Sequence, residues 1–123
     1  MFTVSIETEF SAAHILRGYN GPCSRPHGHN WKVIVEAKTE HLDQLGMSVD
    51  FYVLQKKTQE IIERFDHRDI NMIPPFDKEL NPTSENLARF IFNELKTQLP
   101  PHVVLASVAI AETGSYIATY TES

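Results

Sequence analysis

Three histidines lie where they could support metal-assisted chemistry. His27 and His29 are two residues apart in CSRPHGHN, which opens a segment of alternating apolar and polar residues. In a β-strand, residues two apart project from one face about 6.5 Å from each other, so both imidazoles can turn toward one ion. His14 ends an earlier alternating segment and shares its inward parity. If the two strands pair, three neutral histidines would leave a fourth position open, which is typical of catalytic zinc.

Other interpretations of these histidines stay open. Each could be an ordinary surface or core residue, which is our interpretation of His41 and His102. The donor set could also suit another divalent metal. Zinc is favoured for chemistry without a redox step.

The single cysteine, Cys23, lies in a Gly- and Pro-rich loop over residues 18–26, between the proposed ligands His14 and His27. Near a cation and beside Arg25, a thiol ionises more readily, so Cys23 is a candidate base or nucleophile. Two alternatives are a fourth metal ligand and an inert small residue.

Two further stretches carry groups that could move protons or bind a planar ligand. In FDHRDIN, the Asp66 carboxylate could orient the His67 imidazole and support its charged form. The alternative is a solvated helix end. Glu112 ends VVLASVAIAE on the parity of Val104 and Ile110, which alternation predicts to face inward. In a pocket, this carboxylate could accept two parallel hydrogen bonds from an amidine-like group.

Hydrophobic periodicity indicates which elements must position these residues. Residues 2–14 and 27–38 alternate, which predicts two antiparallel strands. Residues 51–65 follow helical spacing after Asp50, a plausible N-cap, and a second helix begins at Thr83. Its buried face is predicted to continue to Leu99.

Residues 103–112 and 115–121 are predicted strands joined by a tight Thr113-Gly114 turn. The order ββααββ predicts an α+β fold, in which an antiparallel four-stranded sheet carries two helices on one face.

Length and composition limit the class of protein. The 123 residues, with a net charge of −5, predict a single domain over 1–123 and no general nucleic-acid binding. We expect no signal peptide and no membrane span. One cysteine fits a reducing cytoplasm, where we expect the protein to reside.

The motifs together resemble the 6-pyruvoyl-tetrahydropterin synthase family, and most closely its 6-carboxy-5,6,7,8-tetrahydropterin synthases of queuosine and 7-deazaguanine biosynthesis. The matching stretches are FSAAH, CSRPHGHN, VDF, FDHRDIN, NPTSEN and AETGSYIATY. The resemblance implies the tunnelling fold (T-fold), whose subunits assemble their sheets into an oligomeric barrel. It implies a homohexamer, a dimer of trimers, with active sites between subunits.

The resemblance also implies roles for nine residues. The zinc ligands would be His14, His27 and His29. Cys23 would accept a proton from the substrate side chain, with Asp66 and His67 as its relay partners. Glu112 would anchor the pterin ring, and Thr83 and Glu85 would help to line its pocket.

The implied substrate is 7,8-dihydroneopterin triphosphate, and the implied products are 6-carboxytetrahydropterin, acetaldehyde and triphosphate. Three residues separate Cys23 from His27, which resembles the queuosine-pathway enzymes. The main alternative is 6-pyruvoyl-tetrahydropterin synthesis from the same substrate. A remote alternative is a non-catalytic zinc- or pterin-binding module. Arg17, Arg25 and Arg68 lie near the proposed site in sequence and are candidates to face the triphosphate.

Overall fold

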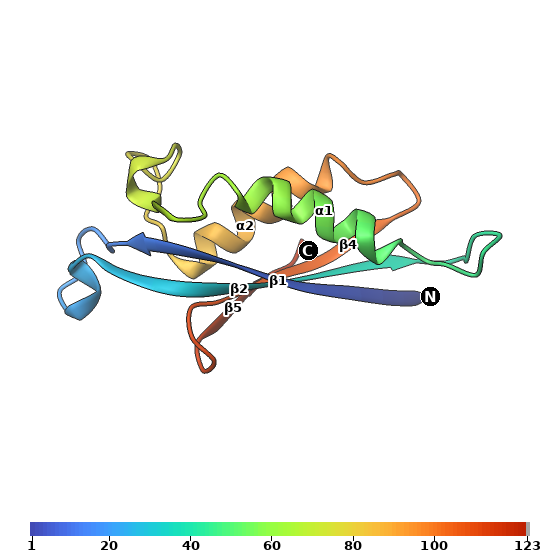
Figure 1. The fold of residues 1–123 in the computed structure, drawn as a ribbon, viewed down its shortest axis with the longest axis horizontal. Helices are drawn as coiled ribbons and strands as arrows, with labels where there is room; N and C mark the ends of the chain where they lie inside the picture. Colours follow the sequence, from blue (N-terminus) through green and yellow to red (C-terminus); the bar gives the residue numbers. More distant parts are fainter. Residues whose placement is uncertain (123) are drawn as a thin grey trace.

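Two long antiparallel strands are the main elements of the sheet. The computed structural model describes residues 1–122, and in it β1 (Phe2–His14) pairs with β2 (His27–Thr39) along their whole length. The register runs from Phe2 opposite Thr39 to His14 opposite His27. The two strands therefore span the molecule and end together at the loop that carries Cys23 (Figure 1).

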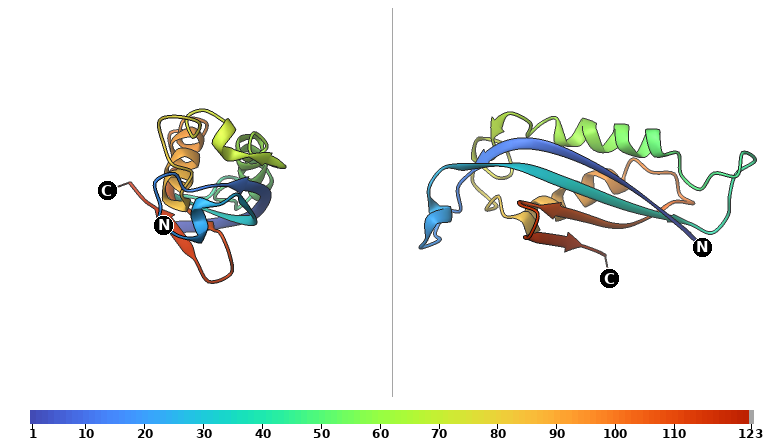
Figure 2. Two further views of the ribbon diagram at one scale, coloured as in Figure 1. Left: turned by 90° about the vertical axis from the view of Figure 1, so that its left-hand side faces the viewer. Right: turned by 60° about the horizontal axis from the view of Figure 1, so that its bottom comes forward.

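The remaining elements complete an α+β fold. They are α1 (Phe51–Ile62), β3 (Arg68–Asp69), α2 (Ser84–Lys96), β4 (Val104–Ala111) and β5 (Ile117–Tyr120), with short 3-10 turns η1 (Pro22–Ser24) and η2 (Ile70–Met72). Both helices cover the same face of the sheet, as predicted (Figures 1 and 2). Within residues 1–122, no helix is long and apolar enough to cross a membrane.

The sheet has one more strand than the sequence predicted. Its order is β3-β1-β2-β4-β5, and the four predicted strands are antiparallel. The added strand, β3, pairs in parallel with Ala12 and Ala13 of β1. Two residues are too short for alternation to reveal a strand.

Side-chain caps set where the helices begin. The Asp50 carboxylate accepts the backbone N–H of Tyr52 at 2.9 Å, and the Thr83 hydroxyl accepts that of Asn86 at 3.0 Å. Each cap satisfies an N–H that has no partner within its helix. Both predicted starts are confirmed. Helix α2 ends at Lys96, and Leu99, predicted for its buried face, packs against the core from beyond the helix.

Strand β4 departs from simple alternation. Glu36 of β2 pairs with Ser107, but the next residue, Ala37, pairs with Leu105, so one extra residue bulges out of β4. A bulge reverses which parity faces the core. The prediction that Val104 faces inward is therefore wrong, since Val104 is 55% exposed and Leu105 is buried. Beyond the bulge, Val108 and Ile110 are buried as predicted.

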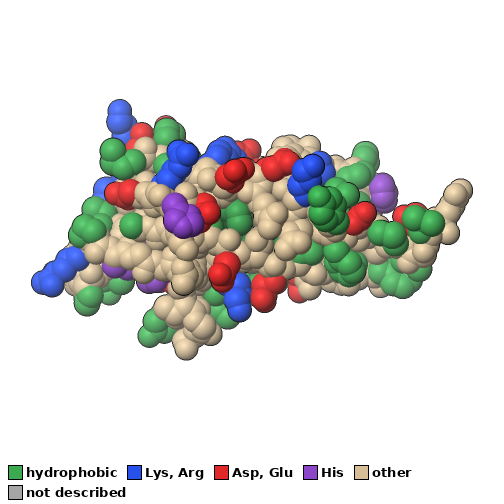
Figure 3. Space-filling view, viewed as in Figure 1, with side chains coloured by type: hydrophobic (Ala, Val, Ile, Leu, Met, Phe, Trp, Pro, Cys, Tyr) green, Lys and Arg blue, Asp and Glu red, His purple; other side chains and the backbone are tan. Residues whose placement is uncertain are grey.

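The core lies between the helices and the inward face of the sheet. Ile6, Phe10 and Ala12 of β1 are buried there as their parity predicts, whereas Phe2 lies at the strand's far end and is 45% exposed. Trp31 of β2 is fully buried and stacks against Phe10 with ring centroids 5.9 Å apart. Figure 3 shows basic side chains scattered among acidic ones, without a continuous basic patch on this face.

Candidate metal centre

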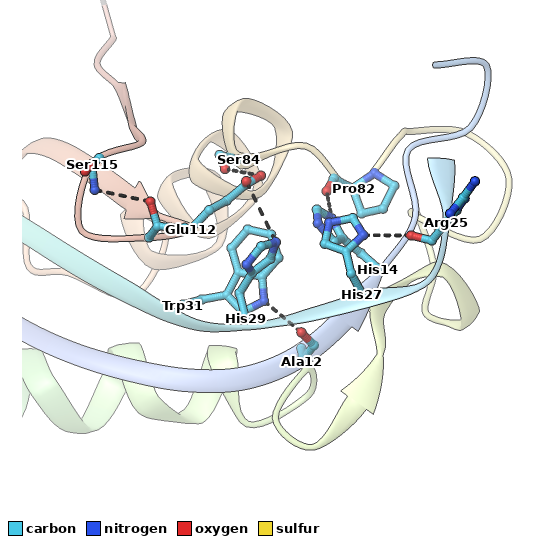
Figure 4. Close-up of polar contacts among 11 residues, drawn as sticks. Ala12, His14, Arg25, His27, His29, Trp31, Pro82, Ser84, Glu112 and Ser115 are labelled. Atoms are coloured by element: carbon cyan, nitrogen blue, oxygen red, sulfur yellow. Dashed lines mark hydrogen bonds and ion pairs between the residues drawn. The ribbon is translucent and has the colours of Figure 1, made fainter. Parts of the chain in front are cut away.

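The three predicted metal ligands converge at the ends of β1 and β2. His14 lies directly opposite His27, and His29 lies opposite Ala12, so all three side chains leave the same face of the strand pair. One ring nitrogen from each lies within 4.8 Å of the others. Figure 4 shows the imidazoles grouped beside Pro82 and below Glu112. The spacing argument for a three-histidine cluster is confirmed in its geometry.

Backbone carbonyls orient two of the rings. His14 Nδ1 lies 2.7 Å from the Pro82 carbonyl oxygen, and His27 Nδ1 lies 2.7 Å from that of Arg25 (Figure 4). A carbonyl oxygen can only accept a hydrogen bond, so Nδ1 carries the proton in both rings. The Nε2 atoms of the neutral rings then keep a free lone pair. Metal-binding histidines are commonly oriented by such hydrogen bonds from the other ring nitrogen.

The unpartnered nitrogens test whether a cation fits. Among the described residues, Nε2 of His14 and Nε2 of His29 are buried without a hydrogen-bond partner. Leaving such an atom unsatisfied costs about 1–3 kcal/mol, and two in one cluster are unusual. A divalent cation that accepts these lone pairs would remove the cost. The three histidines therefore fit a metal ion by their donor chemistry as well as by their distances.

Burial favours the neutral forms of His14 and His29. Desolvation lowers the pKa of His14, and the neighbouring His27 and His29 lower it further, against the opposing effects of the Pro82 carbonyl and of Glu112. Desolvation also lowers the pKa of His29, with Glu112 opposing it. A metal ligand must be the unprotonated imidazole. The site thus favours the form that can bind a cation near neutral pH.

The Trp31 side chain packs against two of the three histidines. The Trp31 ring lies edge-on to His14 and His29, with centroids 4.7 and 5.0 Å away. Its Nε1–H donates to the Ala12 carbonyl oxygen at 3.1 Å, which fixes the indole between the two ligand-bearing strands. Electrostatic interactions are stronger beside a fully buried indole than in water.

Cys23 lies in the turn η1, within the loop that joins the two ligand-bearing strands. Its thiol is free and half-buried, and its carbonyl oxygen accepts the Leu16 N–H at 2.8 Å, which draws the loop back toward the end of β1. Among the described residues, the group close enough to share one ion contains the three histidines and not Cys23. The structure therefore offers no support for the cysteine as a fourth ligand.

Asp66 and His67 form a pair in the turn after α1. The helix ends at Ile62, so the two side chains can meet, and His67 Nδ1 lies 3.0 Å from Asp66 Oδ1. Asp66 Oδ1 also accepts the Ser11 N–H at 2.9 Å. This hydrogen bond, followed by those from His67, holds the Asp66 pKa below its usual range. The expected carboxylate–imidazole pair is present.

The His67 side chain of this pair faces solvent. His67 adopts a left-handed backbone with φ of 58°, its N–H donates to the Ser11 carbonyl oxygen, and its side chain is 81% exposed. It lines an open groove together with His29 and Asn30. Among residues 1–122, no hydrogen bond links Asp66 or His67 to Cys23. A positive φ at a non-glycine residue is uncommon and marks a position held by its surroundings.

Glu112 follows β4 and turns toward the histidines. Its Oε1 accepts the Ser84 hydroxyl at 3.0 Å, and its Oε2 lies 3.8 Å from His29 Nε2 (Figure 4). The side chain is 20% exposed. Thr83, one residue before Ser84, caps α2, while Glu85 is exposed in the first turn. Glu112 therefore lies beside the histidine cluster. Thr83 lies close to Glu112 because it directly precedes Ser84 at the start of α2.

The three candidate arginines differ in availability. The Arg17 guanidinium donates to the carbonyl oxygens of Phe76 at 2.8 Å and Leu80 at 2.6 Å. It is therefore committed to the fold. Arg25 and Arg68 are exposed.

Comparisons with known proteins identify the family of the chain. Residues 3–123 match the family model described as 6-pyruvoyl tetrahydropterin synthase. The chain belongs to the 6-pyruvoyl tetrahydropterin synthase family. The human 6-pyruvoyl tetrahydrobiopterin synthase is 33% identical over 95% of this chain and 89% of its own. The solved structure of the *Caenorhabditis elegans* 6-pyruvoyl tetrahydropterin synthase superposes with a TM-score of 0.86 at 32% identity, over 99% of this chain and 96% of that one.

The names of the relatives refer to two different products. A relative from *Archaeoglobus fulgidus*, provisionally named a 6-carboxy-5,6,7,8-tetrahydropterin synthase, is 39% identical over 75% of this chain and 74% of its own. Relatives of both names thus match the chain. Membership establishes a tetrahydropterin synthase family and its T-fold, while the product is a separate question.

Sequence reasoning missed two residues that contact the candidate site, Ser84 and Pro82. Ser84 was not predicted to contact Glu112, because a serine in the first turn of a helix is typical of capping chemistry alone. Pro82 was missed because its contribution is a backbone carbonyl, which no residue type reveals. Its place one residue before the cap was the only available signal.

Proposed function

We propose that this protein is a zinc-dependent 6-carboxy-5,6,7,8-tetrahydropterin synthase of queuosine biosynthesis. It would convert 7,8-dihydroneopterin triphosphate and water to 6-carboxytetrahydropterin, acetaldehyde and triphosphate. The observation that carries the proposal is the cluster of His14, His27 and His29, with two buried Nε2 atoms unpartnered among the described residues. The short spacing from Cys23 to His27 and the relative from *Archaeoglobus fulgidus* support the carboxy-forming branch.

Zinc suits this donor set because three histidines and an open position are typical of catalytic zinc. When bound, it would act as a Lewis acid toward the side-chain oxygens of the substrate. His14 and His27 are already held in the tautomer that offers Nε2. His29 also contributes a ring nitrogen to the cluster, and its Nε2 is buried without a hydrogen-bond partner among the described residues.

The chain's own groups divide the proton transfers and the binding. Cys23, held on the loop between the ligand strands, accepts a proton from a side-chain carbon of the substrate. The Asp66–His67 pair passes protons, with the carboxylate supporting the charged imidazole. Glu112 anchors the pterin: Ser84 holds Oε1, and Oε2 accepts from the amidine-like edge of the ring. Thr83 and Glu85 line the approach to it.

Assembly would complete the site. His67 is exposed and has no hydrogen bond to Cys23 within residues 1–122, so we propose that the pair acts on the cysteine of a neighbouring subunit. Residues 2–10 of β1 have no strand partner on their outer edge among the described residues, and β5 is the opposite edge of the sheet. Such open edges favour pairing with another copy. A homohexamer made of two trimers would close them.

Product analysis tests the proposal. Zinc-loaded protein is incubated with 7,8-dihydroneopterin triphosphate, and pterins and acetaldehyde are followed by mass spectrometry. We expect acetaldehyde and 6-carboxytetrahydropterin in equal amounts. Pyruvoyl-tetrahydropterin without acetaldehyde would instead identify the second candidate, which the human and *Caenorhabditis elegans* relatives favour.

A variant separates catalysis from mere binding. Cys23→Ala should retain zinc and lose turnover, because the base is removed while the three histidines remain. A wild type without turnover, with unchanged pterin affinity in Cys23→Ala, would favour a binding module.

A further inference from the structure

The chain beyond the end of β1 is held by two asparagine side chains. The Ile15 N–H donates to Asn71 Oδ1 at 2.8 Å, and Asn71 Nδ2 donates back to the Ile15 carbonyl oxygen at 3.2 Å. The Arg17 N–H donates to Asn81 Oδ1 at 2.9 Å, and Asn81 Nδ2 donates back to the Arg17 carbonyl oxygen at 2.9 Å. Each amide thus replaces a paired residue of a neighbouring strand.

The two pairs continue a regular pattern along one edge of β1. At Ser11, the N–H and carbonyl oxygen bind Asp66 and His67, and the next residues pair with β3. Beyond the strand, Ile15 and Arg17 are both half-buried, so their backbone groups need partners within the protein. Only a carboxamide offers an acceptor and a donor side by side. The chemistry at positions 71 and 81 therefore requires an amide and would not be met by a carboxylate.

These contacts surround the parts of the proposed site. His14 immediately precedes Ile15, and its Nδ1–H is held by Pro82, the residue after Asn81 (Figure 4). Leu16 lies between Ile15 and Arg17, and its backbone N–H donates to the Cys23 carbonyl oxygen. The Arg17 guanidinium adds two hydrogen bonds to the segment that leads to Asn81.

We propose that Asn71 and Asn81 are positioning residues: they set the approach of His14 to the metal and the position of the Cys23 loop. The two asparagines are the last residue of FDHRDIN and the first of NPTSEN, and the proposed proton transfers and pterin binding do not use either of them. The inference rests on the proposed metal site for its first part. Its second part, the position of the cysteine loop, stands without a metal.

The test compares Asn71→Asp and Asn81→Asp with Asn93→Asp. The first two changes keep the shape and the acceptor but lose the donor. The control makes the same chemical change at an exposed position of α2. Zinc affinity is measured by competition with a chelator, and the geometry of the site by the visible spectrum of the cobalt(II) form. The rate of Cys23 alkylation by iodoacetamide is measured on metal-free protein. Far-UV circular dichroism identifies the folded variants, and Asn71→Ser and Asn81→Ser replace any that do not fold.

We expect Asn71→Asp and Asn81→Asp to bind zinc about 10–100-fold more weakly than the wild type, as is usual when a residue that orients a ligand is lost. The cobalt spectrum should change, and Cys23 should be alkylated several-fold faster. The control should match the wild type in all three. Folded variants at Asn71 and Asn81 with the zinc affinity, cobalt spectrum and Cys23 alkylation rate of the wild type would overturn the inference. If the wild type itself binds no zinc, the proposed function fails. The alkylation rate alone then decides whether Asn71 and Asn81 position the Cys23 loop.

Discussion

At the scale of single residues, the tautomers of the histidines explain how a cation site can exist before any ion arrives. The Nδ1–H groups of His14 and His27 donate hydrogen bonds to the carbonyl oxygens of Pro82 and Arg25. The opposite nitrogens are left as acceptors, and that of His14 is buried. Because the rings are fixed by the backbone, little ordering remains to be done when a ligand binds, and preorganisation of this kind raises affinity.

The lowered pKa values of His14 and His29 predict how stability depends on pH. Burial penalises their charged forms, so the unfolded chain, with histidine pKa values near 6.5, binds protons before the folded one does. In metal-free protein, the free energy of unfolding should be greatest above pH 6.5 and fall as the pH drops below it. Urea unfolding at several pH values between 8 and 5 measures this slope.

Two variants identify the source of the slope. His14→Gln should make it shallower, whereas His102→Gln, at an exposed position, should leave it unchanged. The lowered pKa of Asp66 acts in a separate range, since its stabilisation is lost only as the pH falls below about 3.8, the ordinary value for aspartate. An equal slope in wild type and His14→Gln would contradict the assignment.

At the scale of elements, the start of α2 serves several functions in consecutive residues. In NPTSEN, Asn81 holds Arg17, the Pro82 carbonyl holds His14, Thr83 caps the helix and Ser84 holds Glu112. One helix start therefore links the end of β1 to the end of β4. The cap contributes to stability and to the site together.

Thr83→Ala separates these two contributions when it is compared with Asp50→Ala. Both changes remove an N-cap and should lower the free energy of unfolding by about 1 kcal/mol. Asp50 caps α1, where it binds the Tyr52 N–H, and we give it no part in the site. Only Thr83→Ala should also raise KM for the pterin substrate, and Thr83→Ser should restore both properties. Equal KM values in the two alanine variants would leave Thr83 with a capping role alone.

The elements also show what the sequence could and could not predict. Strict alternation over β1 and β2 was sufficient to place His14, His27 and His29 on one face, because the pairing has no irregularity there. The bulge in β4 was not predictable, since every residue near it is small or apolar and either parity fits. The two-residue β3 and the Asn71 and Asn81 pairs were missed for another reason: they depend on contacts between segments more than fifty residues apart.

At the scale of the whole molecule, the proposal that the Asp66–His67 pair acts on the Cys23 of a neighbouring subunit predicts that no single chain contains a complete site. Cys23→Ala and His67→Ala should each abolish turnover as separate proteins. If the pair serves the cysteine of a neighbour, mixed oligomers contain some sites with both wild-type residues. Co-refolding the two variants should then restore about a quarter of wild-type activity, the share expected when each position is drawn at random from equal amounts.

The control for this experiment is a mixture of Cys23→Ala with His29→Ala. Both residues belong to the metal side of the site in one chain, on the loop and on β2. Co-refolding should therefore leave this mixture inactive, because every site receives at least one altered residue from the same subunit. Activity in this control would mean that Cys23 and His29 reach one site from different subunits. No activity in the Cys23→Ala and His67→Ala mixture would place Cys23 and His67 of one site in the same chain. Either result would contradict the proposed assembly.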